Sequence, residues 1–205
     1  MTYLLSLHVS PRGEASFSNQ VLQAFEQEFQ NQHPGTEIKS RYTGDIPHLD
    51  FGAQFAQRVP KDRQNETMQK DFALADQLTD ELDGAAALVI ATPMYNWGPP
   101  SSLKAWIDRI INVRTWYQPS VNLENLPVTV VVSSGGLYSE GENIEHDHLR
   151  PLLRECFSRI GVQDLRFINC DPTGPMEYGS TDKLSPESGF SKALAAIPEA
   201  AARAR

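Results

Sequence analysis

Residues 86–100 read AALVIATPMYNWGPP, and this stretch decides the fold. Its first six residues are continuously apolar, which is typical of a strand buried on both faces of a parallel sheet. Pro93 fixes its own φ and biases Thr92 toward an extended conformation, so the chain is expected to leave the sheet here. Residues 94–97 then form a loop at the carboxyl end of the strand. In an open α/β sheet that edge binds ligands, and this loop offers apolar bulk, an amide and backbone N–H groups to a flat heteroaromatic ligand.

Five segments in all are typical of strands, and they alternate with predicted helices. The strands are expected at residues 3–9, 36–42, 86–91, 126–132 and 165–169. Apolar residues recur at helical spacing from about residue 18 to 33 and over residues 65–82, 100–111, 149–160 and 192–205. Residues 44–60 and 171–179 contain proline and glycine and predict loops. This alternation predicts an α/β fold with one doubly wound, five-stranded parallel sheet, helices on both faces, and a single domain over residues 1–205.

Composition limits the classes of function. The chain has 205 residues, of which 40% are hydrophobic, enough for one substantial α/β core. Its formal net charge of -8 disfavours non-specific nucleic-acid binding, and no apolar run approaches the roughly 20 residues of a membrane helix. The N-terminus lacks the basic region of a signal peptide, and Cys156 and Cys170 have neither zinc nor disulfide spacing. We therefore expect a cytoplasmic protein with reduced thiols and no nucleic-acid or membrane partner.

The loop after the first strand has the features of a phosphate site. Residues 10–18 read SPRGEASFS and lead into a predicted helix. A helix N-terminus supplies unpaired N–H groups and partial positive charge, and Ser10, Ser16 and Ser18 add hydroxyl donors. The alternative is that Ser18 is only an N-cap and the other residues form a polar turn.

The loop after the fourth strand is a further candidate on the same edge. Residues 133–138 read SSGGLY, and the paired glycines allow positive φ and a close approach of backbone to a ligand. Paired glycines also occur in ordinary turns, and residues 94–97 could instead close the core or a dimer interface. The loops after the first, third and fourth strands would meet at one crevice of such a sheet.

Taken together, these residues resemble the FMN-dependent NADH azoreductase family, flavodoxin-like NAD(P)H:quinone oxidoreductases. The resemblance lies in the first-loop serines, in the turn at residues 93–97 followed by LKAWID at residues 103–108, and in residues 133–136. It implies a flavodoxin-like fold and a site for FMN. By resemblance, the FMN phosphate would contact Ser10, Ser16, Phe17 and Ser18; the isoalloxazine would contact Pro93, Met94, Tyr95, Asn96 and Trp97; and its pyrimidine side would contact Ser133, Ser134, Gly135 and Gly136. The family commonly has Phe where Trp97 stands and Arg where Ser134 stands.

The resemblance also implies an activity. It indicates an FMN-dependent oxidoreductase that transfers two electrons from NADH or NADPH to quinones or azo compounds in a ping-pong cycle. It further implies a homodimer in which each active site is built partly from the other subunit. A flavodoxin-type electron carrier, which serves a protein partner and does not oxidise nicotinamide directly, is the alternative. The apolar turn at residues 94–97, together with Trp116 and Tyr117 as a substrate pocket, favours the enzyme.

Other residues receive a structural interpretation. Tyr138 could donate a proton or stack on substrate, although such tyrosines more often cover apolar surface. His146-Asp147-His148 is expected to be a helix start and not a metal site, because residues two apart on a helix point in different directions. No G-x-G-x-x-G motif follows the first strand, which disfavours a Rossmann enzyme that binds nicotinamide alone. Trp106 and Trp116 could supply a dimer interface.

Overall fold

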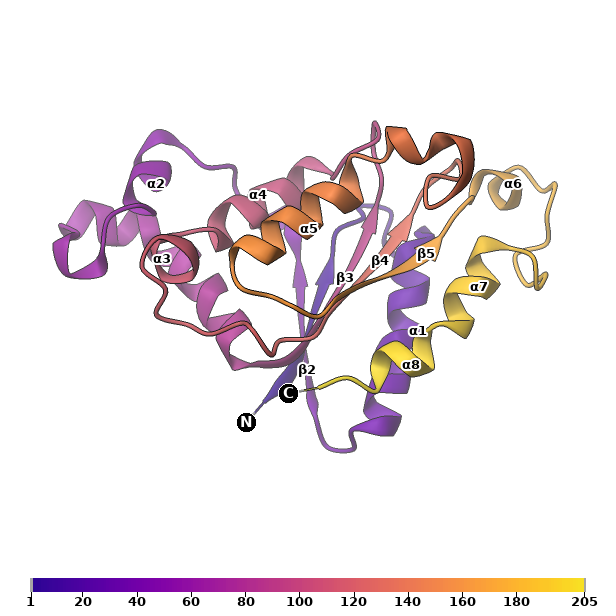
Figure 1. Ribbon diagram of the computed structural model, residues 1–205, viewed down its shortest axis with the longest axis horizontal. Coiled ribbons are helices and arrows are strands. Elements are labelled where there is room, and N and C mark those ends of the chain that lie inside the picture. Colours follow the sequence, from indigo (N-terminus) through magenta and orange to yellow (C-terminus); the bar gives the residue numbers. More distant parts are fainter. Residues whose placement is uncertain (1, 205) are drawn as a thin grey trace.

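The computed structural model describes residues 2–204 and contains a five-stranded parallel sheet in the order β2-β1-β3-β4-β5 (Figure 1). The strands are β1 (Tyr3–His8), β2 (Glu37–Tyr42), β3 (Ala85–Pro93), β4 (Val128–Ser133) and β5 (Leu165–Cys170). The helices are α1 (Phe17–Gln32), α2 (Phe51–Ala56), α3 (Glu66–Gly84), α4 (Ser101–Ile110), α5 (Leu149–Arg159), α6 (Gly174–Glu177), α7 (Gly189–Ala195) and α8 (Ile197–Ala201). From β1 the chain goes to β2 at one edge of the sheet, and it then returns past β1 to add β3, β4 and β5 on the other side, so the order in which strands are added reverses between β1 and β3. The predicted doubly wound, flavodoxin-like sheet is therefore confirmed.

The central strand β3 explains why the sheet is parallel and fully covered. All nine of its residues are buried, and it pairs with β1 on one side and β4 on the other. Leu88 and Ile90 pack into the hydrophobic cluster on one face, whereas Val89 and Ala91 pack into the cluster on the other. Because both faces of β3 are buried, its residues are apolar without alternation, which explains the continuous apolar run in the sequence.

Two layers of helices cover this sheet (Figure 1). Helices α3, α4 and α5 contribute Leu78, Trp106 and Leu153 to one cluster. Helices α1 and α8 contribute Phe25 and Ile197 to the other, together with α7. Each large apolar side chain buried in this way stabilises the fold by about 1.5–3 kcal/mol relative to exposure. The layers therefore hold the carboxyl ends of the strands in fixed relative positions.

The predicted single helix over residues 192–205 is wrong. Helix α7 begins earlier, at Gly189, and a separate helix α8 follows it, with Pro198 in its first turn. Proline is tolerated in a first turn, but within a continuous helix it would remove a hydrogen bond and clash with the preceding turn. Arg205, the last residue of that prediction, and Met1 lie outside the described residues.

Two further expectations need correction. Residues 44–60 are not only loop, because α2 forms within them and the Asp50 side chain caps it by accepting from the N–H of Ala53 at 2.8 Å. Trp106 cannot supply a dimer interface, because it is 1% exposed and its ring lies 6.3 Å from that of Phe157 in the core. The burial of Trp106 depends on a tertiary contact that the local pattern does not reveal, whereas the α2 cap is a local signal that the proline and glycine of this stretch obscured.

Candidate functional site

The carboxyl ends of β1, β3 and β4 meet at a cleft of about 150 Å³. Its walls come from the loop after β1, the turn after β3, the loop after β4 and the short helix α6. The residues that line it are Ser10, Arg12, Ser16, Phe17, Pro93, Met94, Tyr95, Ser133, Ser134, Gly135, Thr173 and Glu177. The three predicted loops are thus brought together in one place.

The start of α1 forms one wall of the cleft. Ser16 is its N-cap residue, and the Ser16 hydroxyl lies 3.0 Å from that of Ser18 and does not accept an N–H of the first turn. The alternative of Ser18 as the N-cap is wrong, because Ser18 lies inside the first turn and is fully buried. The first-turn N–H groups of this 16-residue helix therefore have no side-chain cap. Such a helix start, with its partial positive charge, can bind a phosphate.

The turn after β3 is a two-residue hairpin. Tyr95 and Gly98 exchange both backbone hydrogen bonds, each 3.0 Å long. Asn96 and Trp97 have φ values of 48° and 64°, and both central residues of a type I′ turn require positive φ. Asparagine tolerates this conformation, whereas tryptophan adopts it at a cost of about 1–2 kcal/mol. The Trp97 carbonyl is held in place by accepting from the N–H of His148 at 2.9 Å.

The hairpin exposes two aromatic side chains, and one of them, Tyr95, lines the cleft. Met94, expected in an exposed loop, is instead buried among the core residues, and its N–H donates to the carbonyl of Ser133 at 2.8 Å. Tyr95 is 41% exposed and Trp97 is 52% exposed. Met94 thus joins the β3 turn to the β4 loop, while the two aromatic rings remain free to contact a flat ligand.

Asp171 organises the β4 loop, and sequence reasoning missed it. One carboxylate oxygen accepts from the N–H groups of Tyr138 at 3.2 Å and Ser139 at 3.0 Å, and the other accepts from the Ser139 hydroxyl at 2.8 Å. The Ser134 hydroxyl and an Arg150 nitrogen lie 3.4 and 3.5 Å away. The only sequence signal was an Asp-Pro pair directly after β5 at the ligand-binding edge.

Residues 171–179 are not only the predicted loop, because the short helix α6 forms within them and carries the far wall of the cleft. The N–H of Thr173 donates to the carbonyl of Ser134 at 2.8 Å, and the N–H of Gly174 donates to that of Gly135 at 3.0 Å. A Cβ at Gly174 would lie 2.9 Å from the Gly135 carbonyl oxygen, so the close approach requires glycine. Glu177 ends this helix and lines the cleft, another residue that the sequence did not indicate.

Most predicted cofactor residues line the cleft, and four do not. Ser18 is buried behind Ser16, and Gly136 lies under the Tyr138 ring, where an added Cβ would come within 3.0 Å of a ring carbon. Asn96 lines a neighbouring hollow with Pro99, Lys104 and Leu152, and the Trp97 side chain is exposed at the tip of the hairpin. Tyr138 packs against the core of the α4–α5 face and is not among the lining residues.

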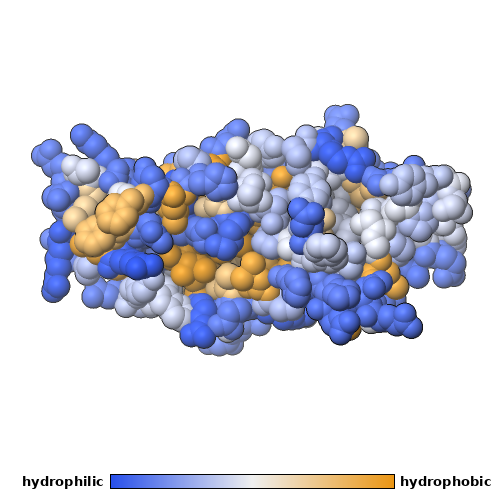
Figure 2. All heavy atoms as spheres, turned by 90° about the horizontal axis from the view of Figure 1, so that it is seen from above, coloured by the Kyte–Doolittle hydropathy of each residue, from blue (hydrophilic) through white to orange (hydrophobic). Residues whose placement is uncertain are grey.

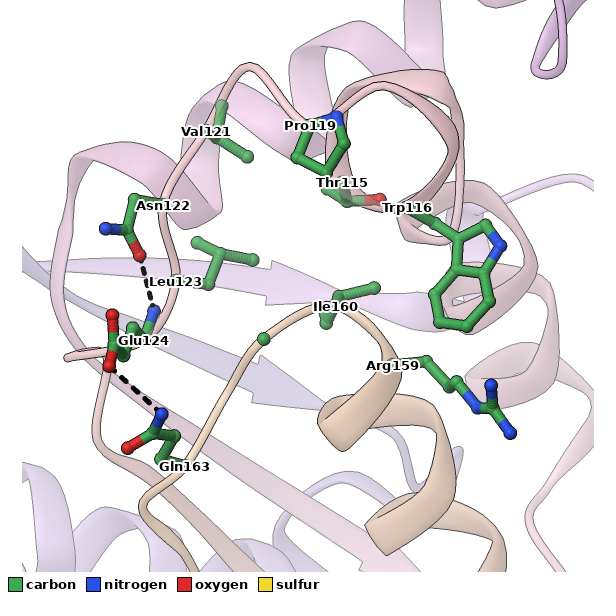
Figure 3. A pocket seen from close by; sticks show the side chains of 11 residues that line it. Thr115, Trp116, Pro119, Val121, Asn122, Leu123, Glu124, Arg159, Ile160 and Gln163 are labelled. Atoms are coloured by element: carbon green, nitrogen blue, oxygen red, sulfur yellow. Dashed lines mark hydrogen bonds between the residues drawn. The ribbon is translucent and has the colours of Figure 1, made fainter.

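Trp116 and Tyr117 lie away from the cleft of their own chain. Both belong to η4 (Val113–Tyr117), a turn of π-helix. Trp116 lines a separate cavity of about 610 Å³ with Leu123 and Ile160, and the Arg159 guanidinium carbon lies 5.0 Å from its ring centroid (Figure 3). Tyr117 lines a hollow of about 470 Å³ between the α2 region and α4.

An apolar area lies on the carboxyl edge, toward the α2 end of the molecule (Figure 2). On α2, Phe51 is 83% exposed, and its ring stacks on that of Phe55 with 6.5 Å between centroids. The hollow beside it includes Leu49, Ile111 and Tyr117. Exposed apolar groups gathered in this way mark a surface that binds a ligand or another protein.

The part of the chain that the structure describes has no helix long and apolar enough to span a bilayer. Within residues 2–204 there is also no group of three His, Cys, Asp or Glu side chains placed to hold a metal ion. At the expected helix start, Asp147 accepts from the N–H groups of Leu149 and Arg150 at 2.9 and 3.0 Å. Location in the cytoplasm stays a prediction.

The fold and this cleft agree with a known class of proteins. The model of a family described as having a flavodoxin-like fold matches residues 2–188. An azoreductase from Bacillus anthracis superposes with a TM-score of 0.82 at 19% identity, covering 98% of this chain and 99% of that one. A second structure from that species, an FMN-dependent NADH-azoreductase in complex with FMN, has a TM-score of 0.76 at 20% identity, covering 98% of each chain.

Curated relatives narrow the class. The FMN-dependent NADH:quinone oxidoreductase of Azotobacter vinelandii is 33% identical over 178 residues, which cover 83% of this chain and 88% of the relative. The FMN-dependent NAD(P)H:quinone oxidoreductase 1 of Pseudomonas aeruginosa is 32% identical over 182 residues, covering 82% and 86%. The chain therefore belongs to the flavodoxin-like family of FMN-dependent NAD(P)H:quinone oxidoreductases, and the resemblance inferred from its motifs is confirmed.

Proposed function

We propose that this chain is an FMN-dependent enzyme that takes two electrons from NADH or NADPH and passes them to a quinone or an azo compound in ping-pong order. The observation that carries the proposal is the meeting, in one cleft, of an uncapped helix start with an aromatic hairpin from the central strand. The names of the relatives in A. vinelandii and P. aeruginosa support the same activity.

The donor set of the cleft fits FMN. The α1 start and the Ser10 and Ser16 hydroxyls suit a phosphate. Phe17 and Met94 offer apolar contacts to the ring system. A Cβ added at Gly135 would meet nothing within 4 Å, so the backbone of the β4 loop faces open space that a ligand can approach closely.

Bound FMN would supply the redox chemistry, accepting a hydride from the nicotinamide and giving two electrons to the acceptor. The residues of this chain bind and orient. The α1 start offsets the phosphate charge, and backbone N–H groups of the β4 loop stabilise negative charge on the pyrimidine side. Tyr95 and Trp97 provide a flat surface for a planar substrate.

We also propose a homodimer in which the apolar surface beside α2 faces the partner's cleft. Phe51 and Phe55 are exposed on this surface, and Tyr117 lines the hollow next to them. Tyr95 and Trp97 are likewise exposed on the hairpin, so two aromatic surfaces are available to cover each other. Tyr117 would then reach the substrate although it lies away from its own cleft. Replacing Phe51 and Phe55 by serine should convert the dimer to monomer in analytical ultracentrifugation.

The direct test of the function is the visible spectrum of the FMN-reconstituted protein, freed of unbound flavin, before and after anaerobic addition of NADH or NADPH. Bleaching of the bound flavin, followed by its recovery on adding a quinone, is the expected result. Bound flavin that stays oxidised would favour the flavodoxin-type carrier. If the protein loses FMN when unbound flavin is removed, both the reductase and the flavodoxin-type carrier are refuted.

A further inference from the structure

An ion pair crosses the mouth of the cleft. Arg12 Nη1 lies 2.5 Å from Glu177 Oε1, although 165 positions separate the two residues in the sequence. Both side chains line the cleft. They are 52% and 31% exposed, so the pair lies at the entrance and not in the core.

On one side, the pair is anchored to the β4 loop. Glu177 is the last residue of α6, and the beginning of α6 is bound to the β4 loop by the backbone hydrogen bonds from Thr173 and Gly174 described above. The Thr173 hydroxyl adds a bond to the Ser134 carbonyl at 3.2 Å. The Glu177 carboxylate is therefore carried by a wall of the cleft and moves with it.

On the other side, the pair is anchored to the loop after β1. The N–H of Arg12 donates to the Ser10 hydroxyl at 3.3 Å, and the single turn Gly13–Ala15 follows before α1 begins. Since β3 lies between β1 and β4, the ion pair joins the loop after β1 to α6, which is bound to the β4 loop, and so links the walls on the two sides of the β3 turn. It completes a ring of contacts around the cleft.

This ring has to open for a ligand of the size of FMN. The cleft measures about 150 Å³, whereas sites for drug-sized ligands usually measure about 300–1,000 Å³. The contacts between α6 and the β4 loop are largely backbone hydrogen bonds, but the Arg12–Glu177 contact joins two exposed, flexible side chains. Exposed ion pairs are weak, so this contact is the one that breaks most readily.

We propose that the Arg12–Glu177 ion pair is a gate on the cofactor cleft, so that FMN enters and leaves only while the pair is broken. This inference rests on the proposed function, because it takes FMN to be the ligand of the cleft. A gate of this kind closes again over the bound FMN, so loss of the pair lowers the barrier equally in the two directions. An exposed pair of good geometry changes an equilibrium by about two- to five-fold. Association and dissociation should both accelerate by that factor, with an unchanged Kd.

The test uses Arg12→Gln, Glu177→Gln and the double variant. Association is followed by the quenching of FMN fluorescence on mixing with apoprotein, and dissociation by transfer of FMN to an excess of another apoflavoprotein. Each single variant should accelerate both rates about two- to five-fold, and the double variant no further. Glu199→Gln is the matched control, because it breaks an exposed ion pair with Arg166, 2.7 Å long, that is not part of the cleft. It should leave both rates unchanged.

The directions in which the two single variants change FMN binding distinguish a gate from simple attraction of the FMN phosphate by Arg12. If Arg12 acted by attracting the phosphate, Arg12→Gln would weaken FMN binding and Glu177→Gln would strengthen it. Opposite effects of this kind, or wild-type rates in all variants, would overturn the gate while leaving the proposed function intact. Wild-type protein that retains no FMN would overturn the proposed function, and the gate with it.

Discussion

Replacement of Asp171 by asparagine should loosen the β4 loop while leaving the sheet intact. The buried carboxylate accepts three hydrogen bonds between 2.8 and 3.2 Å long, from the N–H groups of Tyr138 and Ser139 and from the Ser139 hydroxyl, and a longer fourth bond of 3.4 Å from the Ser134 hydroxyl. Asparagine keeps an oxygen for the two N–H groups and can donate to the hydroxyl, but it carries no charge. Hydrogen bonds to charged groups contribute about 1 kcal/mol more than neutral ones, so three bonds predict a loss of about 3 kcal/mol in the free energy of unfolding.

The assay is urea unfolding of the apoprotein followed by tryptophan fluorescence, so that bound cofactor does not add to the stability. Ser139→Ala is the graded control, because it removes only the hydroxyl's bond to the charged carboxylate and should cost about 1.5–3 kcal/mol. Asp171→Ala should cost the most, about 3–5 kcal/mol, since it leaves two N–H groups and the nearby Arg150 without this acceptor. FMN affinity should fall in the same order.

The reasoning would be refuted by an Asp171→Asn protein whose stability is within about 0.5 kcal/mol of wild type, the usual range for changes on an exposed surface. That result would mean that the charge of the carboxylate adds nothing to the order of the loop. A normal stability combined with lost FMN binding would assign Asp171 to direct cofactor contact.

Three further predictions concern particular positions. Gly189→Ala should destabilise the apoprotein by about 1–3 kcal/mol, because the new Cβ would lie 2.6–2.7 Å from backbone atoms of Asp171. Gly135→Ala is the matched substitution at a position where the new Cβ meets nothing within 4 Å. It should leave urea unfolding unchanged and weaken FMN binding, as measured by fluorescence titration. Trp97→Gly should be more stable than Trp97→Ala by about 0.5–1 kcal/mol in the same unfolding assay, since both lack the ring and only glycine adopts positive φ freely. Burial raises the pKa of Glu81, but the hydrogen bond and charge of Arg41 outweigh it and lower that pKa below 4.5. Glu81→Gln should therefore be less stable than wild type at pH 7. The two stabilities should converge as the pH falls from about 4.5 through the lower pKa of the folded-state carboxylate, where that carboxylate becomes protonated and its contribution is lost.

The sequence predicted the sheet because its physical signals are local. The continuous apolar run of β3 follows from burial on both faces, and Pro93 marks where that strand ends. Alternation with amphipathic helices then leaves few topologies for five parallel strands. The break at Pro198 had a local signal too, which the alanine-rich composition around it obscured.

The incomplete parts of the predicted site share a different cause. Asp171 and Glu177 act through side-chain contacts with residues at least 21 positions away, and no period or motif encodes such distances. The sequence does not show whether Trp106 or Trp116 is buried, because burial depends on how the neighbouring elements pack. Trp116 and Tyr117 lie outside the cleft of their own chain, so their assignment to a substrate pocket depends on a second copy.

The hairpin from β3 differs mechanically from the other walls. It extends from a strand of which every residue is buried, closes with two mutual hydrogen bonds, and is held by the hydrogen bond from the His148 N–H to the Trp97 carbonyl. Trp97 is therefore expected to move together with the whole hairpin and not independently of it. The cleft therefore has one rigid wall, the hairpin, and one side that opens when the Arg12–Glu177 ion pair breaks. The rate of FMN exchange and the surface offered to the bound flavin therefore depend on different residues, the first on Arg12 and Glu177 and the second on the hairpin, so a substitution can change one without the other.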